Sequence, residues 1–204
     1  MGDGVGLEPI VGDGFELIVV PGEVLVGIDA CGGRGEVAWA GIGPIAAELV
    51  ATLPAGLRRR QLDAEPALAP WLVRGIVVVD GSSPTGRRVA GHLGGHDRPG
   101  ARGMVEVGYT VAAADRGRGL ATAAARAWFA WAHAHGARTA RLSTTDDNAA
   151  SLAVIGHLGL EPVGRVWDED DQAWEAVFEA PLPLPPAASP APDPGTDVAL
   201  ETER

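Results

Sequence analysis

Residues 115–122, with the sequence DRGRGLAT, place two glycines and two arginines directly before a helix-forming stretch. A glycine-containing turn that opens a helix directs successive backbone N–H groups, and the positive end of the helix dipole, into one concavity. Gly117 and Gly119 also lack a Cβ, so an anion can approach the backbone closely. Arg116 and Arg118 can add charge-assisted hydrogen bonds. The segment therefore predicts a binding site for a pyrophosphate group.

This turn is neither a nucleoside-triphosphate loop nor a dinucleotide fingerprint. A Walker loop needs Gly-Lys-Ser/Thr, and the 16 basic residues of this chain are all arginines. A dinucleotide fingerprint needs a third glycine and a later acidic residue that binds ribose, and neither accompanies this turn. The residues therefore argue against ATP and NAD as its ligands.

A second candidate is the acidic run DEDD at residues 168–171, which follows Trp167. It either receives a cationic amine, or supplies a catalytic base, or is a solvated turn between two strands. The histidines indicate no metal site, because His92 and His96 on one strand would stand about 13 Å apart, too far for one zinc ion. We expect no bound metal.

The turn lies between a predicted strand and a predicted helix. Residues 104–111 alternate in polarity, so a strand there would put Glu106 on the face opposite Val105. Residues 120–135 are rich in alanine without internal Gly or Pro, which predicts an amphipathic helix ending at Gly136. A short strand at 139–143 follows, and a strand, a crossover helix and a strand in this order favour parallel pairing.

The other elements complete a mixed α/β domain over residues 1–180. From Pro181 onward the chain is rich in Pro, Ala and acidic residues without an apolar period, so residues 181–204 are expected to form a disordered tail. The remaining predicted elements are strands at 15–20, 75–80, 88–93, 162–166 and 174–178, and helices at 44–53, 57–68 and 148–158.

Charge and composition narrow the partners. A net charge of −11 opposes binding to nucleic acid and favours a cationic partner, or serves solubility alone. No apolar run approaches the roughly 18 residues of a membrane span, and the N-terminus does not have the pattern of a signal peptide. The single cysteine, Cys31, fits a reducing compartment. We expect a cytoplasmic bacterial protein, a monomer or homodimer, with no membrane or nucleic-acid partner.

Three ordered segments, VEVGYTV, RGRGLAT and NAASLAVIGHLGLEPVGR, between Val105 and Arg165 resemble the GNAT superfamily of acyl-CoA-dependent N-acyltransferases. Within it, they look most like the branch that contains ribosomal-protein N-terminal acetyltransferases. The resemblance implies a mixed, mostly antiparallel sheet of about six to seven strands, splayed in the middle and flanked by helices. It also implies acetyl-CoA as cosubstrate and a primary amine, small molecule or peptide N-terminus, as acceptor.

The resemblance further implies which residues hold the cosubstrate. Val111 and Ala113 would pair with the pantetheine arm through their backbone, much as an added strand would. Asn148 would bond the same arm, and Ser151 would lie near the CoA sulfur. The pyrophosphate would be held by the turn residues Arg116, Gly117, Arg118, Gly119, Leu120, Ala121 and Thr122.

Acylation of an amine requires a base for the amine and a proton for the departing thiolate. Glu106 corresponds to the strand glutamate of several GNAT enzymes and is the candidate base, with the acidic run at 168–171 as the alternative. Many GNAT enzymes carry a tyrosine acid in the second helix, where this chain has Ile155; its single tyrosine, Tyr109, belongs to the strand. Ser151 is the candidate acid instead, unless the thiolate, with a thiol pKa of about 8.5, leaves unaided.

These features give three competing functions. The leading hypothesis is an acetyl-CoA-dependent N-acetyltransferase that works by direct attack in a ternary complex. The missing helix tyrosine makes a non-catalytic CoA-binding module of GNAT type the alternative. A plain interaction protein with an acidic tail would bind no CoA at all.

Overall fold

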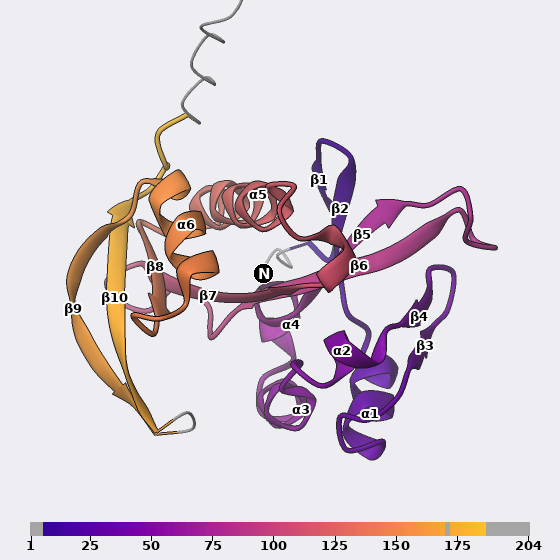
Figure 1. Cartoon of the computed structure of the whole chain (residues 1–204). Helices are drawn as coiled ribbons and strands as arrows, with labels where there is room; N and C mark the ends of the chain where they lie inside the picture. The colour runs from indigo at the N-terminus through magenta and orange to yellow at the C-terminus, as the bar shows by residue number, and fades with distance from the viewer. Residues whose placement is uncertain (1–5, 170–171, 187–204) are drawn as a thin grey trace, which may run out of the picture.

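The computed structural model describes residues 6–169 and 172–186, which are organised around one eight-stranded sheet (Figure 1). The strand order is β1-β2-β5-β6-β7-β8-β10-β9, and every neighbouring pair is antiparallel except β7 with β8. The strands are β1 (Ile10–Gly12), β2 (Phe15–Val19), β5 (Arg74–Val79), β6 (Arg87–Gly95), β7 (Met104–Val111), β8 (Thr139–Thr144), β9 (Glu161–Asp168) and β10 (Ala173–Pro181). The predicted mixed, mostly antiparallel architecture is confirmed, with one strand more than expected because β1 is too short to show a period of its own.

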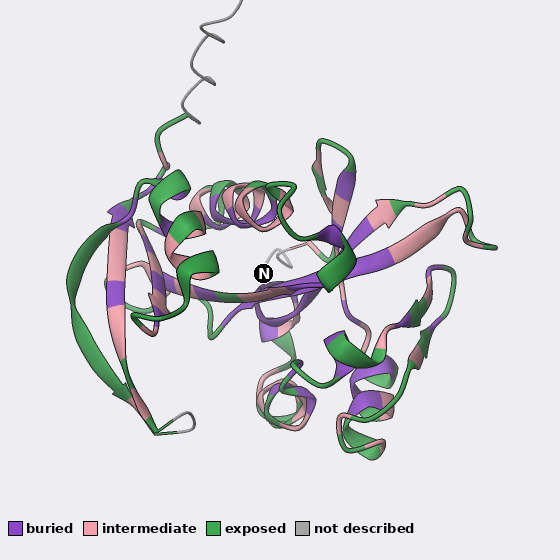
Figure 2. Ribbon diagram, in the orientation of Figure 1, coloured by how far each residue is buried: buried purple, intermediate pink, exposed green. Residues whose placement is uncertain are grey.

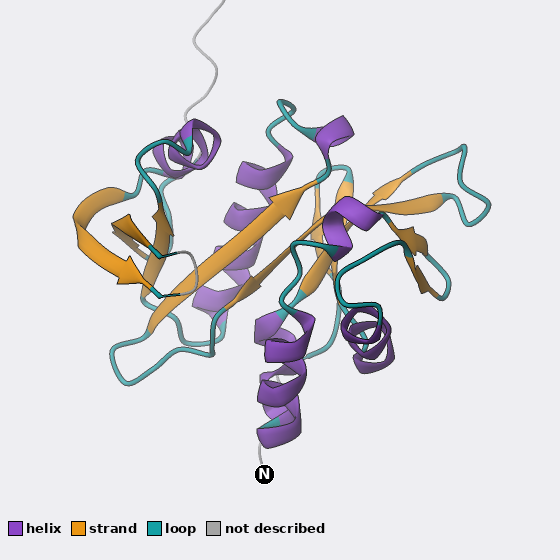
Figure 3. Cartoon of the chain, turned by 60° about the horizontal axis from the view of Figure 1, so that its bottom comes forward, coloured by secondary structure: helices purple, strands orange, loops and turns teal. Residues whose placement is uncertain are grey.

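Helices cover both faces of this sheet (Figures 1 and 3). Helices α5 (Leu120–Ala134) and α6 (Ala149–Leu158) lie on one face. Helix α5 follows the glycine-containing turn at residues 115–119, called the phosphate turn below, and α6 follows β8. The opposite face carries a small hairpin and four helices from the first half of the chain. These are α1 (Gly22–Ala30), β3 (Val37–Trp39), β4 (Gly43–Ile45), α2 (Ala47–Val50), α3 (Ala55–Ala64) and α4 (Ala69–Leu72), with a short 3₁₀ turn at Pro66–Leu68.

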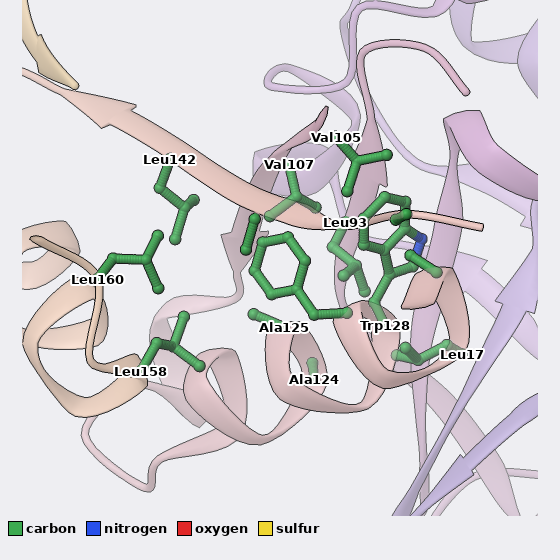
Figure 4. Close-up of a cluster of buried hydrophobic side chains, with 14 of the residues drawn as sticks. Leu17, Leu93, Val105, Val107, Ala124, Ala125, Trp128, Leu142, Leu158 and Leu160 are labelled. Carbon is green, nitrogen blue, oxygen red and sulfur yellow. The ribbon is translucent and has the colours of Figure 1, made fainter. Parts of the chain in front are cut away.

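The alternation of β7 decides which of its side chains enter the core. Val105 and Val107 are buried beneath α5, where Trp128 and Ala124 face them (Figure 4). Trp128 is fully buried, and truncating such a side chain to alanine typically costs about 3–5 kcal/mol. Because side chains alternate along a strand, Glu106 points to the other face of the sheet, as its position in the sequence predicts.

A second apolar cluster lies between the sheet and helices α1 and α2. Figure 2 shows burial concentrated in the central strands, whereas β9 is exposed along most of its length. Within this second cluster Trp39 packs against Gly75 of β5, where a Cβ would lie only 2.5 Å from Trp39 Cζ3. The two clusters fix β6 and β7 between them, which positions the strand that carries Glu106.

The helix expected at 44–53 is only partly present. Pro44 instead belongs to β4, which pairs with β3 through the register Ala38↔Pro44, and the helix is restricted to Ala47–Val50. Proline has no N–H to donate to a ladder. It is therefore tolerated at the edge of such a hairpin, where no partner strand needs that N–H. The burial of Ile45 and Trp39, a tertiary effect, overrides the local helical signal.

Two other boundaries differ from the sequence prediction. The helix expected at 57–68 is α3, which ends at Ala64 because Pro66 disfavours helical backbone at the residue before it, and Glu65 has φ −147°. Pro181 ends β10 and Leu182 is buried, with its N–H donating to Arg138 O at 2.8 Å. The first residues of the segment assigned to the tail thus pack on the domain, and residues 187–204 lie outside the described residues.

Candidate active site

The sheet opens between its two parallel strands. β7 and β8 are paired over three residue pairs only, from Met104↔Thr139 to Glu106↔Arg141. Beyond Glu106, β7 continues to Val111 along β6, while β8 continues along β10. The predicted splay of the sheet is therefore present, and it begins at the candidate base.

The phosphate turn follows the end of β7 and leads into α5. Gly117 and Gly119 have φ values of +72° and +74°, which L-residues with a Cβ rarely adopt. A Cβ at either position would meet nothing within 4 Å, so the glycines are required by backbone conformation rather than by crowding inside the protein. The space beside these two glycines is therefore open.

An ion pair between a buried carboxylate and a partly exposed arginine anchors this turn to β6. The Asp115 carboxylate is 4% exposed and accepts hydrogen bonds from Arg88 Nη1 at 2.5 Å and Nη2 at 2.7 Å. These bonds hold the pKa of Asp115 below its usual value. Sequence reasoning missed Arg88, because 27 residues separate the partners and no local signal connects them.

The two arginines of the turn have different roles. Arg116 Nε donates to the carbonyl oxygen of Val111 at 2.9 Å, so its side chain braces the end of β7. Arg118 has a side chain that is 72% exposed, and its Nη1 lies 3.9 Å from Asp115 Oδ1. Both arginines are exposed, so neither guanidinium is enclosed in a buried anion site.

The turn forms one wall of a cavity of about 420 Å³ that lies between β7 and α6. It contains most of the predicted cofactor-binding residues, but Ala113, Arg118 and Asn148 are not among those that line it. The Ala113 N–H donates to the Glu48 carboxylate at 3.3–3.4 Å instead. The predicted residues in the lining are Val111, Arg116, Gly117, Gly119, Leu120, Ala121, Thr122 and Ser151.

A second cavity, of about 510 Å³, contains the candidate base. Glu106 accepts a hydrogen bond from Ser143 Oγ at 2.9 Å, and His96 Nδ1 lies 4.0 Å from Glu106 Oε2. The His96 side chain is 55% exposed, and its partial desolvation shifts its pKa downward while the nearby carboxylate of Glu106 opposes that shift. Asp168 and Glu175 also line this cavity, which gives it an acidic character suited to an ammonium group.

The structure describes only the first half of the acidic run at residues 168–171. Asp168 lies in the same cavity as Glu106, whereas Asp170 and Asp171 lie outside the described residues. Glu106 and Asp168, which belong to the two alternatives for the catalytic base, therefore line the same cavity.

Ser151 and Tyr109 line both cavities. Asn148 caps α6, since its side-chain oxygen accepts from the Ser151 N–H at 3.1 Å, and this cap orients Ser151 at the first turn of the helix. The Tyr109 hydroxyl donates to Ser151 Oγ at 3.4 Å. Burial raises the pKa of Tyr109, so the phenol keeps its proton at neutral pH.

Sequence reasoning did not foresee this use of Tyr109. The helix position expected to hold a tyrosine is Ile155, and that side chain is buried. The neighbouring strand nevertheless brings a phenol to the same helix. Tyr109 lies on the part of β7 that pairs with β6 and not with β8, a feature that no local sequence signal marks.

Within the described part of the chain, no helix is both long and apolar enough to cross a membrane. The described residues likewise contain no group of three or more His, Cys, Asp or Glu side chains arranged to hold a metal ion.

Comparison with known proteins adds an independent line of information. A family model described as the acetyltransferase (GNAT) domain matches residues 49–161, more than half of the chain. No curated protein matches the sequence.

Three solved structures illustrate the shared fold. RimJ from Mycobacterium smegmatis in complex with CoA-disulfide is 16% identical with a TM-score of 0.54, over 86% of this chain and 90% of that one. The microcin self-immunity acetyltransferase MccE, in complex with acetyl-CoA and AMP, is 14% identical with a TM-score of 0.56, over 87% and 99%. A GNAT-family acetyltransferase from Bacillus anthracis is 11% identical with a TM-score of 0.55, over 85% and 98%.

Proposed function

Because this chain belongs to the GNAT acetyltransferase family, we propose that it transfers the acetyl group of acetyl-CoA to a primary amine. The acceptor is a small molecule or a peptide N-terminus, and the amine attacks the thioester directly within a ternary complex. We also propose a cytoplasmic location, since the one cysteine, Cys31, is a free thiol of the kind common in reducing compartments.

The observation that carries the proposal is that two cavities share Ser151 and Tyr109. One is bounded by the phosphate turn, and the other contains Glu106 and further carboxylates. A donor with a diphosphate and a long thiol arm suits the first, and a cationic acceptor suits the second. The shared residues then mark the point where the thioester and the amine meet.

In this proposal the backbone N–H groups of the turn and the N-terminus of α5 bind the diphosphate of CoA. Open space at Gly117 and Gly119 allows the phosphates to approach the main chain. The pantetheine arm lies in the gap beyond Glu106, where β7 has no partner on the β8 side among the described residues. The Ala113 N–H would need to leave Glu48 before it could pair with this arm.

The reaction needs two proton transfers. Glu106 takes a proton from the ammonium form of the acceptor, and the neutral amine then attacks the thioester carbonyl carbon. When the tetrahedral intermediate collapses, the C–S bond breaks and the thiolate receives a proton from Ser151. The Tyr109 hydroxyl, which donates to Ser151, restores that proton. The acceptor nitrogen loses its second proton as the amide forms, this proton replaces the one that left Tyr109, and Glu106 releases its own proton to solvent. The acetylated amine and CoA are released without an acyl-enzyme intermediate.

The decisive test compares Glu106→Gln with Glu161→Gln, a matched control on the exposed strand β9. We expect Glu106→Gln to bind CoA with unchanged affinity by calorimetry and to release thiol from acetyl-CoA roughly 10²–10⁴ times more slowly, as is typical of removing a general base. The control should keep full activity. Unchanged turnover in Glu106→Gln would remove Glu106 from the mechanism.

The same assay separates the alternative function. A wild-type protein that binds CoA but releases no thiol with peptides, polyamines, amino acids or aminoglycosides would be a non-catalytic CoA-binding module. A protein with no affinity for CoA would contradict both proposals.

A further inference from the structure

A third cavity, of about 240 Å³, borders the candidate active site. It shares His96, Gly108 and Tyr109 with the cavity that contains Glu106, so the two are neighbours along β7. Gly108 contributes no side chain between them. The other residues that matter here are Arg58 of α3, His92 of β6 and Thr52, which follows α2.

Arg58 is a buried cation without a carboxylate partner. The residue is 7% exposed, and no Asp or Glu among the described residues lies within ion-pair distance of its guanidinium. Its Nη1 donates to Gln61 Oε1 at 2.9 Å and to His96 O at 3.4 Å, while its buried Nε has no hydrogen-bond partner. Burying a charge with unused donors is costly unless a ligand completes the site.

The other buried arginine, Arg74, shows what a structural role looks like. Its guanidinium donates to the carbonyl oxygens of Pro70, Glu8 and Leu17, and it lies 4.9 Å from the centre of the Trp131 ring. Arg74 is thus held by three backbone acceptors and an aromatic face, although its buried Nη2, like Nε of Arg58, has no hydrogen-bond partner. Arg58 has fewer acceptors and borders a cavity, which favours a binding role.

The cavity offers a neutral partner beside this cation. His92 Nε2 lies 3.0 Å from Thr52 Oγ1, and burial lowers the pKa of His92 to about 4. The ring is therefore uncharged at pH 7 and does not add a second buried charge. A single guanidinium beside neutral polar groups suits one anionic oxygen group.

One residue links this cation to the base. The backbone oxygen of His96 accepts from Arg58 and from Gln61 Nε2 at 2.9 Å, while the imidazole of His96 lies 4.0 Å from Glu106. A small molecule that reaches from one side of His96 to the other would meet a cation at one end and a carboxylate at the other.

We propose that Arg58 binds an anionic oxygen group, a carboxylate or a phosphate, carried by the acceptor amine itself. The inference rests on the proposed acetyl transfer and narrows its acceptor to a small zwitterion such as an α-amino acid. The acceptor's ammonium group faces Glu106, and its anionic group enters the cavity beside His92 and receives the free N–H groups of Arg58. A polyamine or an aminoglycoside has no anion to offer and leaves Arg58 unpaired.

The test uses acceptor pairs that differ only in the anion: phenylalanine with phenethylamine, histidine with histamine, and O-phosphoethanolamine with ethanolamine. For wild-type protein we expect kcat/KM to be at least about 50-fold higher for the anionic member of a pair, since an unmatched buried polar site discriminates strongly. The first two pairs test a carboxylate and the third a phosphate. Equal rates within all three pairs would overturn the proposal.

The variants separate recognition from folding. Arg58→Gln should bring the rates within each pair to within a few-fold, and Arg58→Lys should keep part of the preference. Arg59→Gln, a neighbour on α3 whose side chain is 37% exposed and paired with Asp29, is the matched control and should keep the wild-type preference. If Arg58→Gln instead lowers the rates of both members of a pair equally, their ratio is unchanged. That result would indicate general damage to the fold and would overturn the proposal.

A binding measurement makes the result independent of turnover. With CoA bound, N-acetylphenylalanine should bind to wild-type protein at least about 10-fold more tightly than N-acetylphenethylamine by calorimetry, and Arg58→Gln should abolish the difference. If CoA binds and neither product is distinguished, the anion site is wrong while acetyl transfer stands. If CoA itself does not bind, the proposed function is wrong.

Discussion

Replacing His92 should change how the stability of this protein depends on pH. The side chain is buried between Thr52 and Arg58, and burial, followed by the Arg58 charge, lowers its pKa from 6.5 to about 4. Between these two values the unfolded chain takes up a proton that the folded protein refuses. The free energy of unfolding therefore includes a contribution from neutral His92 that is fully present above pH 6.5 and is lost as the pH falls toward 4.

The size of this contribution follows from the two pKa values. A difference from 6.5 to about 4 corresponds to about 3 kcal/mol once both states are protonated. Between pH 7 and pH 5 the loss is about 2 kcal/mol, because at pH 5 the unfolded histidine is nearly all charged and the folded one is still mostly neutral. His92→Gln keeps a hydrogen-bonding group near Thr52 but removes the titration, so its stability should lack this loss.

The measurement is urea unfolding of both proteins at pH 7, 6 and 5, followed by the fluorescence of the six tryptophans. Relative to wild type, His92→Gln should gain about 2 kcal/mol between pH 7 and pH 5. His96 also has a lowered pKa, but it is present in both proteins and cancels in the comparison. The lowered pKa of Asp115 acts below this range. A stability difference that stays constant within about 0.5 kcal/mol across the series would show that His92 is not buried as a neutral ring.

Four further substitutions test the turn and the proton relay. Asp115→Asn removes the carboxylate that anchors the turn, and we expect a loss of about 2 kcal/mol of unfolding free energy with roughly 10-fold weaker CoA binding; unchanged CoA affinity would argue that the anchor is dispensable. Gly119→Ala forces a Cβ into left-handed backbone at a cost of about 1–2 kcal/mol and should weaken CoA binding in calorimetry, whereas Gly164→Ala on exposed β9 should do neither. Ser151→Ala and Tyr109→Phe should each lower kcat with little change in KM for acetyl-CoA. Combining them should add little to the larger single effect, and full additivity would mean that the two hydroxyls do not act as one unit.

The best-predicted part of the fold is the part whose signals are local. The strand expected at 104–111 is β7, and the helix expected at 120–135 is α5, which ends at Ala134 before Gly136 with φ +102°. Alternation, an uninterrupted alanine-rich run and two flanking glycines each act within a few residues. The face that carries Glu106 follows from the same alternation.

The N-terminal half is less predictable because contacts distant in sequence determine it. Gly75 is required by the indole of Trp39, 36 positions earlier, and nothing near Gly75 in the sequence records that constraint. Helix α1 was not predicted at all, since Gly22 at its start, Gly27 in its middle and the glycines that follow Cys31 weaken the helical signal. The expected helix over Pro44 failed for a related reason, the burial of Ile45 and Trp39 in a hairpin.

The residues of the candidate site also differ in whether local sequence or distant contacts determine them. The turn and Glu106 can be found from sequence because their roles depend on backbone conformation and strand phase. Arg88, His96 and Arg58 cannot, because each acts on a group that lies at least ten residues away, such as Asp115 or Glu106. A sequence motif predicts where the donor would be held, while the residues that would select the acceptor come from elements that no motif marks.

The position of Tyr109 shows why the absence of a family residue is a weak argument about chemistry. At Ile155 the helix has a buried aliphatic side chain, and by sequence alone this removes the phenol. Proton transfer, however, depends on where a hydroxyl lies and on its protonation state, and does not depend on which element carries it. The Tyr109 hydroxyl reaches Ser151 of that same helix from the strand, and burial keeps it protonated. The protein therefore retains a phenol and a hydroxyl at this point of the site, and the phenol comes from the part of β7 that has no β8 partner among the described residues.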